Sequence, residues 1–184
     1  SRHRNRHGRI RGWTAMHGER MERKIGRMDK NMDRPIEDMR LAQIGFLVND
    51  IEKTKKEFAR FFGVEEPETV NSGDFEITHT EYRGELAPKA KCYMTFFYFG
   101  DLQMELIQPN GEPSIWREHL EQFGEGIHHI SFNVKGMQKT ISACEDWGMK
   151  LLQKGEYRGA NGRYAFMDAL DSLKVVVELL ERDE

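Results

Sequence analysis

Residues 41–48 read LAQIGFLV, and residues 127–134 read IHHISFNV. Both are strand candidates, because apolar residues alternate with small or polar ones along them. QIGFLV in the first stretch corresponds position by position to HISFNV in the second. Further along each half, MELI (104–107) corresponds to VELL (177–180). Two corresponding pairs in the same order indicate an internal duplication.

The elements around these stretches follow one order in both halves, which is strand, helix and three strands. Asn49 to Glu52 offer a capping box at the start of the first helix, and Gly63 and Gly148 end the two helices. The predicted strands are 41–48, 75–82, 91–99, 102–108, 127–134, 150–156, 163–170 and 173–180, and the predicted helices are 50–62 and 137–147. The sequence therefore predicts an α+β fold. Two βαβββ modules, at about 41–109 and 127–181, form a curved, half-barrel mixed sheet with the helices outside.

Residues 1–40 differ from the rest of the chain and are predicted to be a basic extension. They hold 12 Lys and Arg against 6 Asp and Glu. A stripe of apolar residues at helical spacing predicts an amphipathic helix that ends at Pro35. Its members are Met21, Ile25, Met28, Met32, Ile36 and Met39. We expect this helix to dock on its own domain or on a second copy, and a membrane-surface helix is the alternative. The apolar stripe makes a homodimer the expected state.

Composition excludes several classes of protein. The net charge of −3 combines the basic extension with an acidic body, which argues against nucleic acid as a partner. No stretch approaches the ~20 apolar residues of a membrane helix, and no signal-peptide core is present. Cys92 and Cys144 are too few for a disulfide scaffold or a thiolate zinc site, so a reducing cytoplasm is expected.

Strand alternation predicts which face each residue takes. The apolar face of the two matching strands is expected to pack under the helices. The opposite face carries Gln43 and Gly45 in the first strand and His129 in its repeat. His128 then falls on the apolar face, and we interpret it as a structural core histidine. The residues of the apolar faces are Ile44, Phe46, Val48, Ile130, Phe132 and Val134.

Two carboxylates lie inside apolar strands, Glu105 in LQMELI and Glu178 in VVVELL. An ionised carboxylate is costly to bury without a partner, so each either faces solvent or is balanced by positive charge. If the two halves pair into one curved sheet, these residues converge with Gln43 and His129. Two carboxylates, one imidazole and one amide oxygen suit Zn²⁺, Ni²⁺, Co²⁺ or Mn²⁺, with positions left open for water or substrate. We predict a site for one such divalent ion; the alternative is that Gln43 is merely polar and each Glu is solvated.

These residues give the chain a resemblance to the vicinal oxygen chelate (glyoxalase/bleomycin resistance/dioxygenase) superfamily over about residues 41–181. GEGIHHISFNV (124–134) and DSLKVVVELLE (171–181) resemble methylmalonyl-CoA epimerases. The ligand set is instead similar to that of animal-type glyoxalase I, which binds zinc. Gln43 departs from the epimerases, which usually have His at the first position.

The resemblance implies a metal-dependent isomerase or lyase that abstracts a proton beside a metal-bound carbonyl. Glu178 is the candidate base, and Glu105 returns the proton or stays on the metal. The substrate class would be a thiol adduct or an acyl-CoA. Two alternatives share the fold. A drug-sequestering binding protein needs no ligand set, and an extradiol dioxygenase needs a second His where Gln43 stands.

Other residues are candidates for shaping the pocket. Glu76 loosely matches a second acid/base carboxylate of epimerases, and a solvent-facing Glu is the alternative. For each basic candidate, solvated surface is likewise the alternative. The aromatic candidates are Trp116, Tyr157 and Tyr164, and the basic ones are Arg83, Lys89, Lys91, Arg158 and Arg163.

Overall fold

The computed structural model describes residues 33–184, and most of the predicted apolar stripe, up to Met32, lies outside the described residues. Of its last members, Ile36 packs against the core of the second module and Met39 is exposed. Residues 34–184 form one compact unit, which carries all the elements below.

The strands of this unit form one ten-stranded sheet in the order β2-β5-β6-β1-β7-β10-β9-β8-β3-β4. β1 and β7, where the two halves of the sheet meet, are antiparallel; β6 runs parallel to β1, and β10 runs parallel to β7. The strands are β1 Leu41–Leu47, β2 Val70–Asn71, β3 Glu81–Tyr82, β4 Glu85–Leu86, β5 Cys92–Phe99, β6 Leu102–Pro109, β7 Gly126–Asn133, β8 Lys150–Glu156, β9 Gly162–Asp168 and β10 Val176–Arg182. The order β5-β6-β1 in one half repeats as β9-β10-β7 in the other, so the duplicated plan and the mixed sheet are confirmed.

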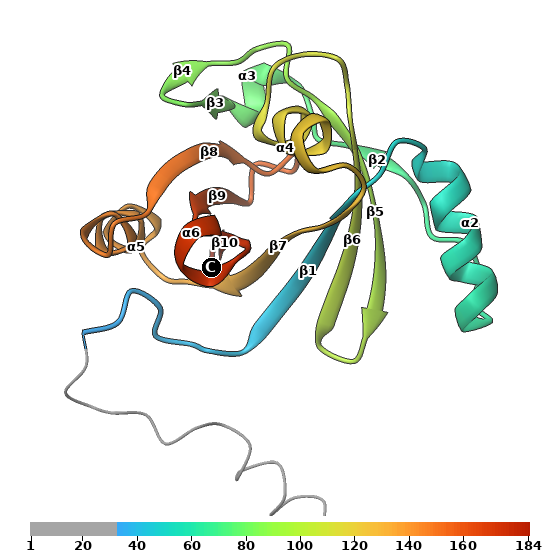
Figure 1. Ribbon diagram of the computed structural model, residues 1–184, viewed down its shortest axis with the longest axis horizontal. Coiled ribbons are helices and arrows are strands. Elements are labelled where there is room, and N and C mark those ends of the chain that lie inside the picture. The colour runs from blue at the N-terminus through green and yellow to red at the C-terminus, as the bar shows by residue number, and fades with distance from the viewer. Residues whose placement is uncertain (1–32) are drawn as a thin grey trace, which may run out of the picture. The chain divides into compact units, whose positions relative to one another are not determined.

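Helices α2 (Ile51–Phe62) and α5 (Met137–Asp146) lie outside the curled sheet, on opposite sides of it (Figure 1). The five described helices are α2 Ile51–Phe62, α3 Phe75–Thr78, α4 Ile115–Phe123, α5 Met137–Asp146 and α6 Leu170–Leu173. α2 packs with Phe46 and Val48, and α5 packs with Ile130 and Phe132, as the alternation predicts. None of the helices in residues 33–184 is long and apolar enough to cross a bilayer.

The ends of α2 follow the predicted signals in part. The Asp50 side chain accepts a hydrogen bond from the backbone N–H of Lys53, and Gly63 ends the helix in the left-handed conformation. The reciprocal half of a capping box is absent. Glu52 instead contacts Lys55 and the Thr69 hydroxyl.

The prediction of a strand over residues 75–82 is wrong for its first half. These residues form the helical turn α3 and then the two-residue strand β3. The turn forms because Asp74 and Phe75 offer their carbonyl oxygens to the N–H groups of Thr78 and His79. β3 pairs with β4 and with β8, so a hairpin from the first half of the chain extends the sheet edge of the second half.

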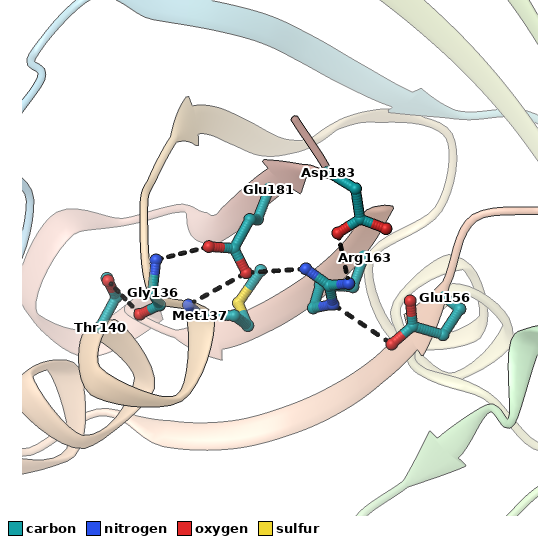
Figure 2. A network of polar contacts seen from close by, with 7 residues as sticks. All are labelled: Gly136, Met137, Thr140, Glu156, Arg163, Glu181 and Asp183. Carbon is teal, nitrogen blue, oxygen red and sulfur yellow. Dashed lines mark hydrogen bonds and ion pairs between the residues drawn. The ribbon is translucent and has the colours of Figure 1, made fainter. Parts of the chain in front are cut away.

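A polar network links the start of α5 to β10 and, through Arg163, to β9 and β8 (Figure 2). The Glu181 carboxylate on β10 accepts hydrogen bonds from two backbone N–H groups at the start of α5. Arg163 on β9 lies 2.9 Å from Glu181, 2.7 Å from Asp183 and 3.3 Å from Glu156. One guanidinium therefore links β8, β9 and β10 beside the N-terminus of the helix.

Candidate metal centre

The register of the four central strands brings the predicted quartet together. Gly45 on β1 pairs with Glu105 on β6 and with His129 on β7. On the far side of β7, Glu178 of β10 pairs with Ser131. Gln43 lies two residues before Gly45 and therefore shares its face. Both halves contribute to the site within one chain.

The donor atoms of the quartet lie at distances that suit one ion. His129 Nε2 lies 3.1 Å from Gln43 Oε1, 3.2 Å from Glu178 Oε2 and 3.4 Å from Glu105 Oε2. Ligand atoms about 2.1 Å from one ion are about 3.0 Å apart at a right angle and about 3.4 Å apart at the tetrahedral angle. Ligand atoms of Glu105, His129 and Glu178 all lie within 4.8 Å of one another, and all three residues are buried.

The Gln43 amide is compatible with a cation at this point. Its inward-facing atom lies 2.9 Å from Glu178 Oε2 and 3.2 Å from Glu105 Oε2. As nitrogen, this atom donates hydrogen bonds to both carboxylates. As oxygen, it faces only acceptors, and a cation among them is needed to offset the repulsion. The residues therefore fit a divalent ion held by two carboxylates, one imidazole and one amide oxygen.

Burial and mutual contact perturb the ionisable groups of the site. Burial raises the pKa of the Glu105 carboxyl, as does the neighbouring Glu178, although the contact with His129 opposes the rise. Burial alone would lower the pKa of His129, but the adjacent Glu178 and Glu105 raise it to about 9. The site thus concentrates negative charge around one imidazole, and a divalent cation would balance that charge.

Gly45 leaves the space that the His129 ring occupies. A Cβ atom at position 45 would lie 1.9 Å from His129 Cε1 and 2.3 Å from Nε2, whereas ordinary contacts begin at 3.4 Å. The imidazole therefore lies directly against the backbone of β1. Sequence reasoning placed Gly45 on the concave face but did not identify this role.

The prediction that His128 lies on the helix-covered face is wrong. The pairing of β1 with β7 shifts register between Gly45 and Phe46, which leaves His128 unpaired as a β-bulge. Because a bulge interrupts alternation, His128 lies on the same side as His129, and their Nδ1 atoms are 2.9 Å apart. His128 is buried, but beside the candidate metal site. The sequence signal for this is the doubled histidine, which breaks the alternation of the strand.

Ser131 is a second residue whose contact the sequence did not reveal. Its hydroxyl hydrogen-bonds to Glu178 Oε2 and lies 3.1 Å from Gln43 Oε1. It therefore fixes the carboxylate and the amide relative to each other.

A family model described as the Glyoxalase/Bleomycin resistance protein/Dioxygenase superfamily matches residues 42–167. The chain belongs to this superfamily. The resemblance seen in the sequence is therefore confirmed.

Individual relatives agree with membership of the superfamily. The uncharacterized protein YqjC of Bacillus subtilis (strain 168) is 33% identical over 98 residues, which cover 53% of this chain and 70% of YqjC. The methylmalonyl-CoA epimerase of Mycobacterium tuberculosis has a TM-score of 0.56 at 17% identity, covering 84% of this chain and 95% of its own. A Streptomyces coelicolor methylmalonyl-CoA epimerase variant in complex with 2-nitronate-propionyl-CoA has a TM-score of 0.56 at 22% identity, covering 79% and 98%. The two epimerase structures show the shared fold.

Three members of the quartet in this superfamily member face a cavity of about 420 Å³, and His129 lies buried behind them. Gln43, Glu105 and Glu178 line it, and aromatic side chains from both halves form much of its wall. Of the candidates for shaping the pocket, Trp116, Tyr157, Arg158 and Tyr164 line this cavity. α4, which the sequence did not predict, supplies Trp116.

The other pocket candidates lie elsewhere. Arg83 pairs with Glu118, and Lys91 lies 2.8 Å from Asp74. Arg163 belongs to the network beside α5, and Lys89 does not line the cavity. Glu76 is exposed on α3 and does not line the cavity, so the carboxylates nearest the metal site are those of the quartet.

Proposed function

We propose that this protein is a metal-dependent isomerase or lyase that moves a proton at the carbon beside a carbonyl. The observation that carries the proposal is the convergence of Glu105, His129 and Glu178 at the wall of an aromatic cavity. Gln43 would complete the ligand set. A divalent ion bound there would act as a Lewis acid and offset the charge that develops on the carbonyl oxygen.

Glu178 is the proposed base. Its carboxylate lines the cavity, and the Ser131 hydroxyl holds one of its oxygens. A buried, oriented carboxylate can remove a proton from a substrate carbon placed beside it. Glu105 faces the same cavity from the opposite side of His129, and it returns the proton or remains a ligand.

The charge around the cavity supports an anionic substrate. Among the arginines of residues 35–184, Arg158 and Arg182 form no ion pair, and both line the cavity. A thiol adduct of glutathione and an acyl-CoA both carry anionic groups. The ligand set supports the first, in the manner of glyoxalase I. The complex of one structural neighbour with 2-nitronate-propionyl-CoA supports the second.

The test combines metal content with proton exchange. Protein purified without chelators should contain about one divalent ion per chain, and His129→Ala should lose it. In deuterated water, the metal-loaded protein should exchange the α-proton of either the glutathione hemithioacetal of methylglyoxal or methylmalonyl-CoA. The substrate that exchanges distinguishes lyase from epimerase.

Two variants test the assignment of the base. Glu178→Gln should lose exchange by at least about 100-fold. Glu76→Gln, an exposed control, should retain it. Full turnover by a Glu178→Gln protein that binds metal would refute the assignment. Absence of metal in the wild type, after addition of zinc, nickel and cobalt, would favour the drug-sequestering binding protein instead.

The proposal includes a homodimeric state and a location in the cytoplasm. Exposed aromatic residues at the end of α2 and on the neighbouring strand, among them Phe61 and Phe99, support a homodimer. Light scattering of the whole chain and of a chain without residues 1–38 tests this state and the role of the extension. The free, buried Cys92 and Cys144 support a reducing compartment such as the cytoplasm.

A further inference from the structure

The two nitrogens of the His129 ring have different environments. Nε2 faces Gln43, Glu105 and Glu178, whereas Nδ1 lies 2.9 Å from Nδ1 of His128. Two ring nitrogens form a hydrogen bond only when one carries a proton and the other accepts it. When Nε2 of a neutral imidazole binds a metal, its proton is on Nδ1. In that state His129 donates and His128 accepts.

The His128 ring is held in place for this contact. It is 1% exposed and packs against Phe166 and His119, with ring centroids 5.3 Å and 4.6 Å away. The β-bulge brings it beside His129, and His119 on α4 packs against it as well. A rigid acceptor at this position fixes both the rotation of the His129 ring and the nitrogen that carries its proton.

The cost of His128 argues against a role in packing alone. Its Nε2 is buried and has no hydrogen-bond partner among the described residues. When Nδ1 accepts, the proton of neutral His128 is on Nε2, so a buried donor stays unpaired. An unpaired buried donor is unfavourable, whereas an apolar side chain of similar size would fill the space without that cost. The contact through Nδ1 is the feature that an apolar residue could not supply.

We propose that His128 is a positioning residue for the metal site, whose Nδ1 accepts the hydrogen bond from Nδ1 of His129 and so keeps His129 Nε2 directed at the ion. The inference rests on the proposed metal site. It predicts that metal affinity depends on an acceptor at position 128, while the stability of the metal-free protein does not.

Three variants separate the acceptor from the bulk of the ring. His128→Leu removes the acceptor and keeps the volume. His128→Asn places a carbonyl oxygen near the position of Nδ1, and His128→Gln carries its oxygen one bond further from the backbone. Zn²⁺ affinity is measured by competition with a chromophoric chelator, and the Tm of each metal-free protein is measured alongside.

His128→Leu should weaken Zn²⁺ binding by about 10- to 100-fold, without lowering the Tm of the metal-free protein. His128→Asn should recover most of the affinity, and His128→Gln should not. Nitrogen-15 spectra of the zinc-loaded wild type should show His129 protonated at Nδ1 and His128 protonated at Nε2. This last measurement needs no variant, so it holds even if a variant fails to fold.

The outcomes distinguish the inference from the proposed function. If the wild type binds no metal, the proposed function fails and this inference fails with it. If the wild type binds Zn²⁺ and His128→Leu binds it equally well, the inference alone is overturned. A zinc-loaded wild type in which His128 carries its proton on Nδ1 would overturn it as well.

Discussion

Replacing Gly45 with alanine tests whether the backbone of β1 shapes the metal site. The new Cβ would lie 1.9 Å from His129 Cε1, which is about 1.5 Å short of the 3.4 Å at which ordinary contact begins. The ring cannot simply tilt away, because its other neighbours include His128 and Phe166, whose ring centroid is 5.1 Å from that of His129.

Either the ring or the strand must therefore move by more than the ~0.2 Å within which metal–ligand distances vary. Zn²⁺ affinity should fall by at least about 100-fold, as measured by chelator competition. The added methyl group should also lower the free energy of unfolding of the metal-free protein by about 1–3 kcal/mol, as measured by urea denaturation.

Gly111 provides the matched control. A Cβ there would have nothing within 4 Å, and its backbone is not left-handed, so Gly111→Ala should change neither quantity. If Gly45→Ala bound Zn²⁺ as tightly as the wild type, then His129 would not bind the ion with its ring in the observed position against β1. The assignment of the quartet would have to be abandoned.

Three further predictions concern other parts of the molecule. Burial alone would raise the pKa of the Glu181 carboxyl, but hydrogen bonds from the start of α5 and from Arg163 lower it. The stabilisation that the ionised carboxylate provides is therefore complete above its ordinary pKa of 4.5 and is lost as the pH falls through the lowered pKa. Glu181→Gln should therefore lower the Tm at pH 7, and the difference from wild type should shrink below pH 4.5; a constant difference would contradict this. Arg158→Gln should raise KM for an anionic substrate about tenfold and leave kcat unchanged, whereas an equal effect on a neutral analogue would exclude charge recognition. Burial raises the pKa of the Cys144 thiol to about 11, and Cys92 is also buried. Neither thiol should therefore react with a maleimide at pH 7.5 unless the protein is unfolded. Rapid labelling of the native protein would show that the core opens.

The sequence predicted most of the elements because their signals are local. β8 was predicted at its observed bounds, and α2 begins directly after the capping residue Asp50 and ends at Gly63. Glu105 and Glu178 were expected to converge with His129 because alternation and duplication assign them to the same face, and their carboxylates lie beside its ring. These features depend on neighbours a few residues away.

The features that the sequence did not reveal depend on distant partners. His128 changes face because of the register between β1 and β7; the doubled histidine marks an irregularity, but the pairing with β1 decides which way the ring turns. β3 is only two residues long, and besides its hairpin partner β4 it pairs with β8 from the other half. The fit of Gly45 to the His129 ring likewise exists only once the two halves are paired.

The hairpin of β3 and β4 belongs to the first half of the chain but pairs with β8 of the second half. The second half alone would leave β8 as an open edge, which invites pairing with another chain. Fragments divided near residue 112 should therefore remain incomplete apart and recover the sheet when mixed. Each half of the duplicated chain is therefore completed by the other, because the hairpin that covers β8 comes from the first half of the same backbone.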